Sequence, residues 1–287
     1  MILDIIKVII LAIVEGLTEF LPISSTGHLI ICGKFIELSP KEFSNAFFVI
    51  IQLGAILSVL YLYFNDLNPI AKSKLKVKAG TDYNNLSLKE KFQLRDLATM
   101  RLIAKILVGF LPAALLGFLF DDLIDKYLFN EVTVAIALIF YGIIIIFMEK
   151  RNKSVSFKYE SLEDITIKTA FLIGIFQCLA MVPGTSRSAA TIIGAMLLGC
   201  SRTSAAKFSF YLAIPTMLGA TVLKIFKIGL SFSLGQWFLI LLGSVVSYFV
   251  ALIVIKKFLA YIRNNDFTYF GLYRIVLGII VLLVTFI

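Results

Sequence analysis

Charged residues are scarce in this sequence: they make up 16% of its 287 residues, whereas soluble domains carry about 25%. Cysteine and histidine are also scarce, with three and one respectively. The cysteines, Cys32, Cys178 and Cys200, lie in apolar stretches without paired or metal-ligand spacing. With 60% hydrophobic residues, this composition excludes a soluble enzyme, a disordered chain and a secreted disulfide scaffold.

Long apolar runs dominate the chain instead, and the mean hydropathy is +0.96. Runs 43–65 and 228–255 contain no charged residue. Nearly uncharged apolar segments of about 18 residues or more are typical of transmembrane helices. We therefore expect an all-α polytopic membrane protein, embedded in the lipid bilayer as one domain, 1–287. Six segments are expected to span the bilayer: residues 43–64, 102–120, 131–148, 205–223, 236–255 and 268–287.

Two further apolar regions, 3–33 and 165–200, are interrupted by polar segments at 22–27 and 183–188. The apolar pieces beside each interruption are too short to cross a bilayer, which takes about 20 residues. Interrupted segments at corresponding positions of two halves are typical of inverted-repeat membrane proteins. We therefore predict two re-entrant helical hairpins in an inverted-topology repeat. The expected parts are a first repeat at about 1–120, a second at about 131–255 and a final span at 268–287.

Lysine and arginine collect in three of the loops. Loop 65–101 carries eight of them, and loops 149–168 and 256–266 are also basic, whereas loop 121–131 is acidic. Basic loops face the cytoplasm, so we expect both termini outside and the two hairpin tips together near the bilayer midplane. The net charge of +9 is then explained by the basic cytoplasmic loops, and we expect no nucleic-acid partner. Beyond contact with anionic lipid, no role follows for loop 65–101.

Four ionisable residues interrupt the apolar regions: Glu15, Glu19, His28 and Arg187. An ionisable group in a membrane helix costs about 2.5–3.5 kcal/mol on insertion scales, so these residues indicate function. Glu15 and Glu19 are four residues apart, on one helix face, where carboxylates repel unless a cation lies between them. That cation is a divalent ion, Mg²⁺ or Ca²⁺, or the guanidinium of Arg187. The alternative is a first helix at the membrane interface, with both carboxylates in water.

The polar interruptions have the composition of a phosphate site. Ser24, Ser25 and Gly27 precede His28 at an expected helix start, where hydroxyls and free N–H groups bind phosphate. Arg187 lies among hydroxyls in the second interruption, and arginine binds phosphate in a bidentate manner. A packed histidine and an arginine that reaches the membrane surface are the structural alternatives. The combination favours phosphoryl chemistry on an anionic group at membrane depth.

Residues 15–28, EGLTEFLPISSTGH, resemble the first signature of the undecaprenyl-pyrophosphate phosphatase (bacitracin-resistance) family, and residues 183–191, PGTSRSAAT, resemble its second. Length, span number and motif positions agree, so the resemblance covers essentially the whole chain. It implies an integral-membrane hydrolase with six spans and two re-entrant hairpins. Its expected reaction removes the terminal phosphate of undecaprenyl pyrophosphate, which recycles the carrier for peptidoglycan and envelope polymers and confers bacitracin resistance. Gln177 and Met181 replace a second acidic pair, so the chemistry is expected on the first hairpin.

The resemblance also implies a role for each motif residue. Ser25 is the expected nucleophile, and His28 is expected to handle its proton or that of the leaving group; His28 as nucleophile stays open. Glu19 is expected to orient His28 or act as a base, and to hold a divalent cation together with Glu15. Arg187 is expected to bind pyrophosphate oxygens. The other expected substrate-binding residues are Ser24, Thr26, Gly27, Gly184, Ser186, Ser188 and Thr191.

The main alternative function is an inverted-repeat transporter or flippase of a polyprenyl phosphate. A phosphatidic-acid-type phosphatase needs a second histidine, which this chain lacks. We expect a multi-pass protein of the bacterial cytoplasmic (inner) membrane whose active site opens to the outer, periplasmic side. A homodimer, the identity of the metal, the accepted prenyl chain lengths and flipping of the product are left open.

Overall fold

The computed structural model describes residues 2–74, 86–128, 130–152, 156–228 and 232–286. Within these ranges the chain is helical, apart from turns and one isolated bridge between Tyr159 and Cys200. In chain order the helices are α1 (Ile2–Thr18), α2 (Ser25–Phe35), α3 (Lys41–Leu62), α4 (Phe64–Leu67), α5 (Leu88–Gln93), α6 (Leu97–Tyr127), α7 (Glu131–Asn152), α8 (Ile167–Cys178), η2 (Leu179–Met181), α9 (Arg187–Leu197), α10 (Arg202–Ile228), α11 (Leu234–Ile262) and α12 (Thr268–Phe286). Lys76, Lys78 and Lys153, three of the predicted loop cations, lie outside the described residues.

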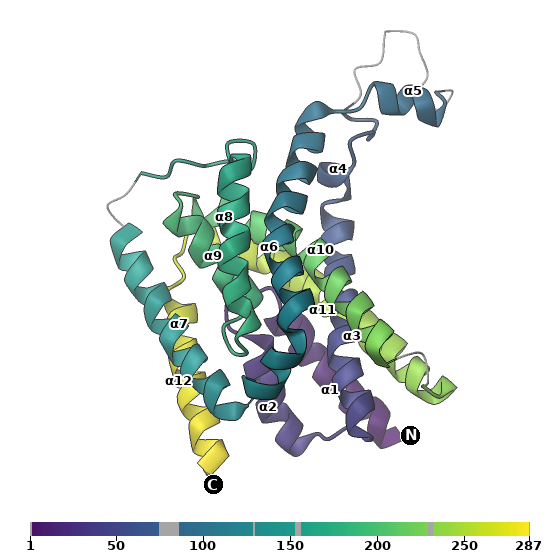
Figure 1. Cartoon of the computed structure of the whole chain (residues 1–287), viewed down its shortest axis with the longest axis vertical. Helices are drawn as coiled ribbons and strands as arrows, with labels where there is room; N and C mark the ends of the chain where they lie inside the picture. Colours follow the sequence, from purple (N-terminus) through teal and green to yellow (C-terminus); the bar gives the residue numbers. More distant parts are fainter. Residues whose placement is uncertain (1, 75–85, 129, 153–155, 229–231, 287) are drawn as a thin grey trace.

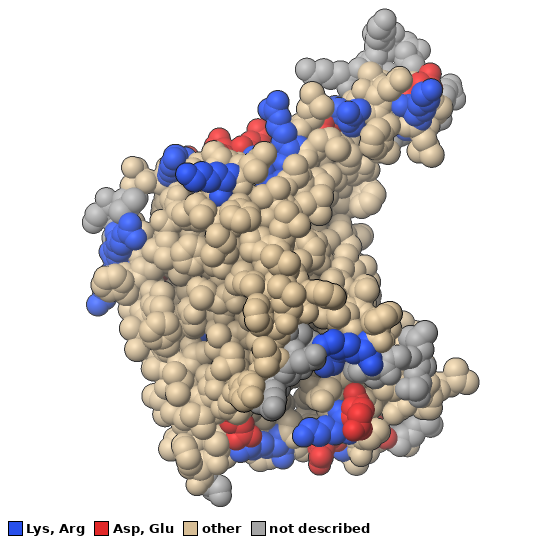
Figure 2. Space-filling view, viewed as in Figure 1, with Lys and Arg blue, Asp and Glu red and all other residues tan. Residues whose placement is uncertain are grey.

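Six helices are long and apolar enough to cross a membrane. They lie at Lys41–Leu62, Leu97–Phe120, Glu131–Asn152, Arg202–Lys227, Leu234–Ile262 and Thr268–Phe286. These helices confirm the six predicted spans, and most of them begin or end a few residues beyond the predicted limits because flanking polar residues continue the helix. Lys, Arg, Asp and Glu gather toward two ends of the molecule and leave a broad band of other residues between them (Figure 2). Large apolar side chains such as Phe118 and Phe147 are exposed, as expected for a multi-pass protein in lipid.

The two predicted interruptions separate pairs of short helices. The first lies between α1 and α2, and the second between α8–η2 and α9. In Figure 1 the α1–α2 pair comes from the lower part of the molecule and the α8–α9 pair from the upper part, toward each other. Glu19 lies just after α1, but its N–H still bonds to the carbonyl of Glu15 at 2.9 Å. The helical register therefore continues as far as Glu19.

A shared backbone conformation relates the two interruptions. Ser24 and Ser186 have φ values of 70° and 72°, a region that non-glycine residues rarely adopt. Each is the N-cap of the following helix, and its hydroxyl accepts from the N–H of Gly27 (3.4 Å) or Ala189 (3.3 Å). This match supports a repeat between the two halves. The inverted topology and the re-entrant position in a bilayer stay predictions.

Glycines allow the spanning helices to pack closely. A Cβ atom on Gly54 of α3 would overlap the backbone of Ser244 in α11. Gly142 of α7 and Gly271 of α12 each lie against the other's carbonyl oxygen in the same way. Small residues at such crossings let membrane helices approach each other. The α7–α12 contact matters for function, because α12 carries residues of the candidate site.

A buried carboxylate fixes the start of α12. Glu149, near the end of α7, is fully buried and accepts hydrogen bonds from Nε and Nη2 of Arg202. It also accepts from the backbone N–H of Phe267 at 3.0 Å. Because Phe267 immediately precedes α12, this carboxylate connects the end of α7 with the beginnings of α10 and α12.

Replacement of Gly54 by alanine should destabilise the protein, because the added methyl group meets the backbone of Ser244. We expect the free energy of unfolding to fall by about 1–3 kcal/mol, measured as a lower Tm in detergent. Gly33→Ala is the matched control, since a Cβ at Gly33 meets nothing within 4 Å. Equal stability of the two variants would contradict the close packing of α3 on α11.

Candidate active site

The two interruptions lie in direct contact. Nη2 of Arg187 forms an ion pair with Oε1 of Glu19 at 3.1 Å, across 168 positions of sequence. The hydroxyl of Ser188 donates to the carbonyl of Leu21 at 2.8 Å. The predicted meeting of the two tips is therefore present as a contact between side chains and backbone.

The Glu19 carboxylate has a second partner on the first interruption. The hydroxyl of Ser25 donates to Oε2 of Glu19 at 2.8 Å. Glu19 thus bonds to Arg187 through one oxygen and to Ser25 through the other, and its side chain is 8% exposed. This arrangement suits a carboxylate that accepts the proton of the Ser25 hydroxyl.

The carboxylate of Glu15, unlike that of Glu19, is isolated among the described residues. It is fully buried, and neither carboxylate oxygen has a partner among the described residues. A buried carboxylate of this kind requires a proton or a cation, since an unpaired charge in an apolar interior is very unfavourable. Paired carboxylate oxygens one helical turn apart are a donor set that suits Mg²⁺ or Ca²⁺. No group of three or more His, Cys, Asp or Glu side chains that could hold a metal ion occurs among the described residues, so any further ligands of a cation at this pair would have to be hydroxyls, water or substrate.

Arg187 is held by α10 as well as by Glu19. Its Nη1 donates to the carbonyl oxygen of Ser209 at 2.9 Å and to the Ser209 hydroxyl at 3.3 Å. The Thr191 hydroxyl donates to the same serine oxygen at 2.6 Å. Nε of Arg187 is buried and has no hydrogen-bond partner in the part of the chain that the structure describes. The guanidinium therefore keeps one buried donor available for an anion, and Ser209 is a site residue without a recognisable signal in the sequence.

His28 contacts residues other than Glu19. Its Nδ1 lies 2.7 Å from the carbonyl oxygen of Ser24, and its Nε2 lies 2.6 Å from the hydroxyl of Tyr273 on α12. No hydrogen bond joins Glu19 to His28, although both lie in the described part of the chain. Of the two alternatives predicted for Glu19 besides metal binding, the geometry supports a base next to Ser25 and gives no contact for the orientation of His28.

Arg274, which is not among the predicted site residues, is fully buried. From α12 it donates to the carbonyl oxygens of Pro22 at 3.2 Å and Gly184 at 2.9 Å, one in each interruption. It also donates to the carbonyls of Leu138 and Ala137 on α7, both at 3.4 Å. Its signal was present in the sequence, because it is an ionisable residue inside an apolar span.

Most of the other predicted substrate-binding residues maintain the turns. Ser24 and Ser186 cap helices, Ser188 bonds to Leu21, and Thr191 bonds to Ser209. Two residues, Gly27 and Gly184, pack against α7, where a Cβ would meet Leu138 or the backbone of Val134. Thr26 is the exception, since its hydroxyl has no hydrogen bond within the described residues. These contacts place the residues at the site without assigning them to substrate.

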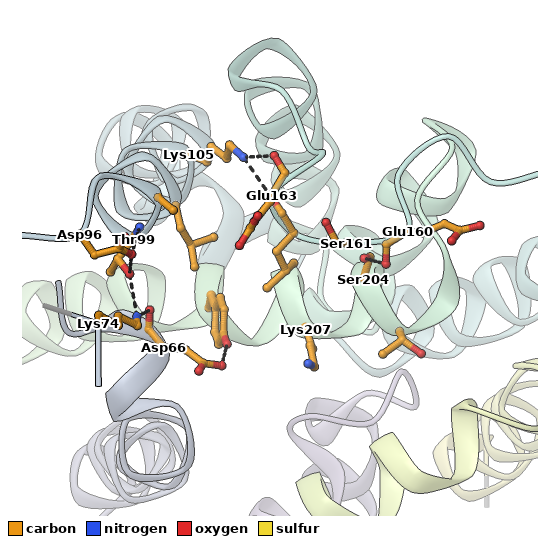
Figure 3. Close-up of a pocket in the computed structure, with 15 residues that line it drawn as sticks. Asp66, Lys74, Asp96, Thr99, Lys105, Glu160, Ser161, Glu163, Ser204 and Lys207 are labelled. Carbon is orange, nitrogen blue, oxygen red and sulfur yellow. Dashed lines mark hydrogen bonds between the residues drawn. The ribbon is translucent and has the colours of Figure 1, made fainter. Parts of the chain in front are cut away.

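A separate pocket of ≈ 570 Å³ lies where α4 and α6 begin (Figure 3). Two of its lysines are already bonded: Lys74 donates to the hydroxyl of Thr99 at 2.6 Å, and Lys105 donates to the carbonyl of Glu163 at 2.8 Å. None of the predicted site residues lines this pocket. It lies apart from the contact between the two interruptions.

Replacement of Arg274 by methionine should destabilise the junction of the two interruptions. The change leaves the carbonyls of Pro22 and Gly184 without their donor, and a buried unsatisfied polar group costs about 1–3 kcal/mol. We expect a lower Tm in detergent together with reduced activity. Arg101→Met, at an exposed position on α6, is the control. If both variants melt at the wild-type temperature, Arg274 does not hold the junction.

Comparison with known proteins shows that the similarity is not confined to the two motifs but covers nearly the whole chain. A family described as "Bacitracin resistance protein BacA" matches residues 8–280. The chain is 50% identical to Undecaprenyl-diphosphatase 1 of Clostridioides difficile over 281 residues, which cover 98% of this chain and 96% of the relative. It is 52% identical to an undecaprenyl-diphosphatase of Fusobacterium nucleatum over 97% of this chain and 100% of the relative.

A third relative, an undecaprenyl-diphosphatase of Enterococcus faecalis, is 46% identical over 99% of this chain and 98% of its own length. The matches leave no substantial part of either chain uncovered, and they include both interruptions and all six spanning helices. With the family match over residues 8–280, they confirm the resemblance indicated by the two motifs. This chain therefore belongs to the bacitracin resistance protein BacA family.

Proposed function

We propose that this chain is an integral-membrane phosphatase that hydrolyses undecaprenyl pyrophosphate to undecaprenyl phosphate and inorganic phosphate. The observation that carries the proposal is the bonded series Ser25–Glu19–Arg187. It brings a nucleophile, a base and a phosphate-binding cation together inside a membrane protein. The names of the relatives support the same substrate. The product is the lipid carrier for peptidoglycan and envelope polymers, and removal of the pyrophosphate accounts for bacitracin resistance.

The reaction begins at Ser25. Its Oγ attacks the terminal phosphorus while Oε2 of Glu19, 2.8 Å away, accepts the hydroxyl proton. The bond from phosphorus to the bridging oxygen breaks, and undecaprenyl phosphate leaves with the bonding electrons. Water then hydrolyses the phosphoserine, which releases inorganic phosphate and restores the serine hydroxyl. Positioning and charge stabilisation supply most of the rate in such transfers.

Arg187 stabilises the charge that develops on the phosphoryl oxygens. Its Nε–H is buried and has no partner within the described ranges, so it gains one when an anionic oxygen enters. The ion pair with Glu19 and the bonds to Ser209 keep the guanidinium in place before the substrate arrives. Preorganised donors of this kind are worth more in a site without water than in solution.

Glu15 and Glu19 are the residues that would hold a divalent cation. When bound, Mg²⁺ or Ca²⁺ supplies positive charge to phosphate oxygens. The two buried oxygens of Glu15 support this assignment, because they have no hydrogen-bond partner among the described residues.

Ser25 is a better supported nucleophile than His28. Both ring nitrogens of His28 are within 2.7 Å of a hydrogen-bond partner, Ser24 on one side and Tyr273 on the other. Attack by His28 requires Nε2 to leave Tyr273, whereas the Ser25 hydroxyl already contacts its base. We therefore assign His28 to proton handling.

The lipid tail is expected to stay in the bilayer along exposed apolar helix faces, such as Leu272 and Val276 of α12. The basic loops support a cytoplasmic position for the opposite end of the molecule, so we place the entrance to the site on the outer side of the bacterial cytoplasmic membrane. Ser25, Glu19 and Arg187 come from one chain, and the proposed reaction does not require a homodimer.

Ser25→Ala and Arg187→Ala test the reaction directly. We expect Ser25→Ala to lower kcat by about 10³-fold or more and Arg187→Ala to lower kcat/KM by about 10²- to 10³-fold, while both still insert in the membrane. The measurement is phosphate release from undecaprenyl pyrophosphate by the purified protein in detergent with divalent metal. Ser161→Ala, at an exposed loop position, is the control. If the wild-type protein releases no phosphate over a range of pH, the proposed phosphatase activity is wrong, and a transporter becomes the better explanation.

Removal of metal tests the Glu15–Glu19 pair. Because two buried carboxylates need a counter-charge, chelation should abolish phosphate release, and excess Mg²⁺ or Ca²⁺ should restore it. Glu15→Gln should raise the concentration of metal that gives half-maximal activity by about tenfold or more. Turnover that continues unchanged after chelation would show that Arg187 or a proton neutralises the carboxylates instead.

A further inference from the structure

Tyr273 contacts the only histidine of the chain. Its hydroxyl lies 2.6 Å from Nε2 of His28, across 245 positions of sequence. The two rings are nearly parallel, with an interplanar angle of 10° and centroids 5.5 Å apart. The contact therefore restrains both the Nε2 atom and the plane of the imidazole.

The opposite ring nitrogen determines the direction of this hydrogen bond. Nδ1 of His28 lies 2.7 Å from the carbonyl oxygen of Ser24, and a carbonyl can only accept. Nδ1 must therefore carry a proton, which leaves Nε2 as the acceptor in the neutral ring. The Tyr273 hydroxyl then donates to Nε2.

The position of Tyr273 is set by its neighbour on α12. Arg274 is fully buried and bonds to the carbonyls of Pro22 and Gly184, whereas Tyr273 is 46% exposed. Helix α12 therefore contacts the junction of the two interruptions through Arg274 and contacts His28 through Tyr273. Since Phe267 is fixed by Glu149, Tyr273 is presented by a helix that is held in two places.

We propose that Tyr273 is a positioning residue, whose hydroxyl acts together with the Ser24 carbonyl to hold the His28 ring in the Nδ1-protonated form, with Nε2 as the single proton-exchanging atom. His28 lies three residues after Ser25 on α2, and therefore on the same side of the helix. Without the tyrosine hydroxyl, Nε2 loses its donor, and the ring is held only by the hydrogen bond from Nδ1 to the Ser24 carbonyl, so its orientation is less restricted. This inference rests on the proposed function, since it concerns how His28 handles protons in that reaction.

The single histidine makes a direct measurement simple. In the full chain labelled with ¹⁵N-histidine and purified in detergent, both ring-nitrogen signals come from His28. We expect wild-type protein to show a protonated Nδ1 and an unprotonated, hydrogen-bonded Nε2. Tyr273→Phe keeps the ring but removes the hydroxyl, so the Nε2 signal should move toward that of a nitrogen without a hydrogen bond. The kcat should fall roughly tenfold, the loss of one hydrogen bond, with KM within about twofold of wild type.

Tyr269→Phe is the matched control, because Tyr269 lies one turn earlier on α12 and is 73% exposed. It should leave the ¹⁵N signals and kcat unchanged. Tyr273→Leu, which also removes the stacked ring, should lower kcat further. The spectra are recorded without substrate, so a failure of the phosphatase assay in wild type would contradict the proposed function but not the tautomer assignment. The proposal is overturned if both ring nitrogens of His28 are protonated in the wild-type protein. It is also overturned if Tyr273→Phe leaves kcat unchanged, whether or not the spectrum changes.

Discussion

The ion pair between Glu19 and Arg187 is the contact on which the rest of the site depends. Both side chains are largely buried, with exposed fractions of 8% and 11%, and neither charge is tolerable alone in an apolar interior. Folding must therefore bring the two interruptions together, or leave two uncompensated charges inside the protein. Because Glu19 also accepts from Ser25, the contact that joins the two halves also orients the reactive hydroxyl. The Glu19 carboxylate therefore contributes both to the stability of the fold and to the proposed reaction.

The last helix, α12, acts as the support of this junction. At its start Glu149 binds Phe267, and two turns further on Arg274 binds a carbonyl in each interruption. A Gly142–Gly271 approach lets α12 lie close to α7. Arginine suits this position because its planar group offers five donors, and carbonyls exposed in a broken helix need donors when no water is present. A residue that takes no part in the proposed reaction thus sets its geometry.

Polar groups at the site divide into those with partners and those without. Serines and threonines of both interruptions are largely engaged in capping and cross-contacts. The carboxylate oxygens of Glu15 and Nε of Arg187 are buried and have no hydrogen-bond partner among the residues that the structure describes. Native proteins seldom leave buried polar atoms unsatisfied. These atoms therefore mark where cation and phosphate are expected to complete the structure.

The six spans, the two interruptions and the motif residues Glu15, Glu19, Ser25 and Arg187 were predictable from the sequence. Hydropathy over about 20 residues is a local property, and bilayer thickness converts it directly into helix number. Broken helices are equally local, because proline, glycine and serine clusters interrupt apolar runs wherever they occur. The expected family also followed from two contiguous motifs, which need no knowledge of contacts.

Partner choice within the site was decided only by the tertiary structure. From the sequence, Glu19 could either orient His28 or act as a base. In the folded chain it bonds to Ser25 and Arg187. Ser209 and Tyr273 carry no local signal, because they act through residues on other helices. Arg274 had a signal, a charge in an apolar span, but its role depends on carbonyls 90 and 252 positions away. Composition therefore determined that the protein lies in a membrane, and which polar and ionisable side chains had to be buried in its interior. Which groups pair inside it depends on distances that only the packed helices define.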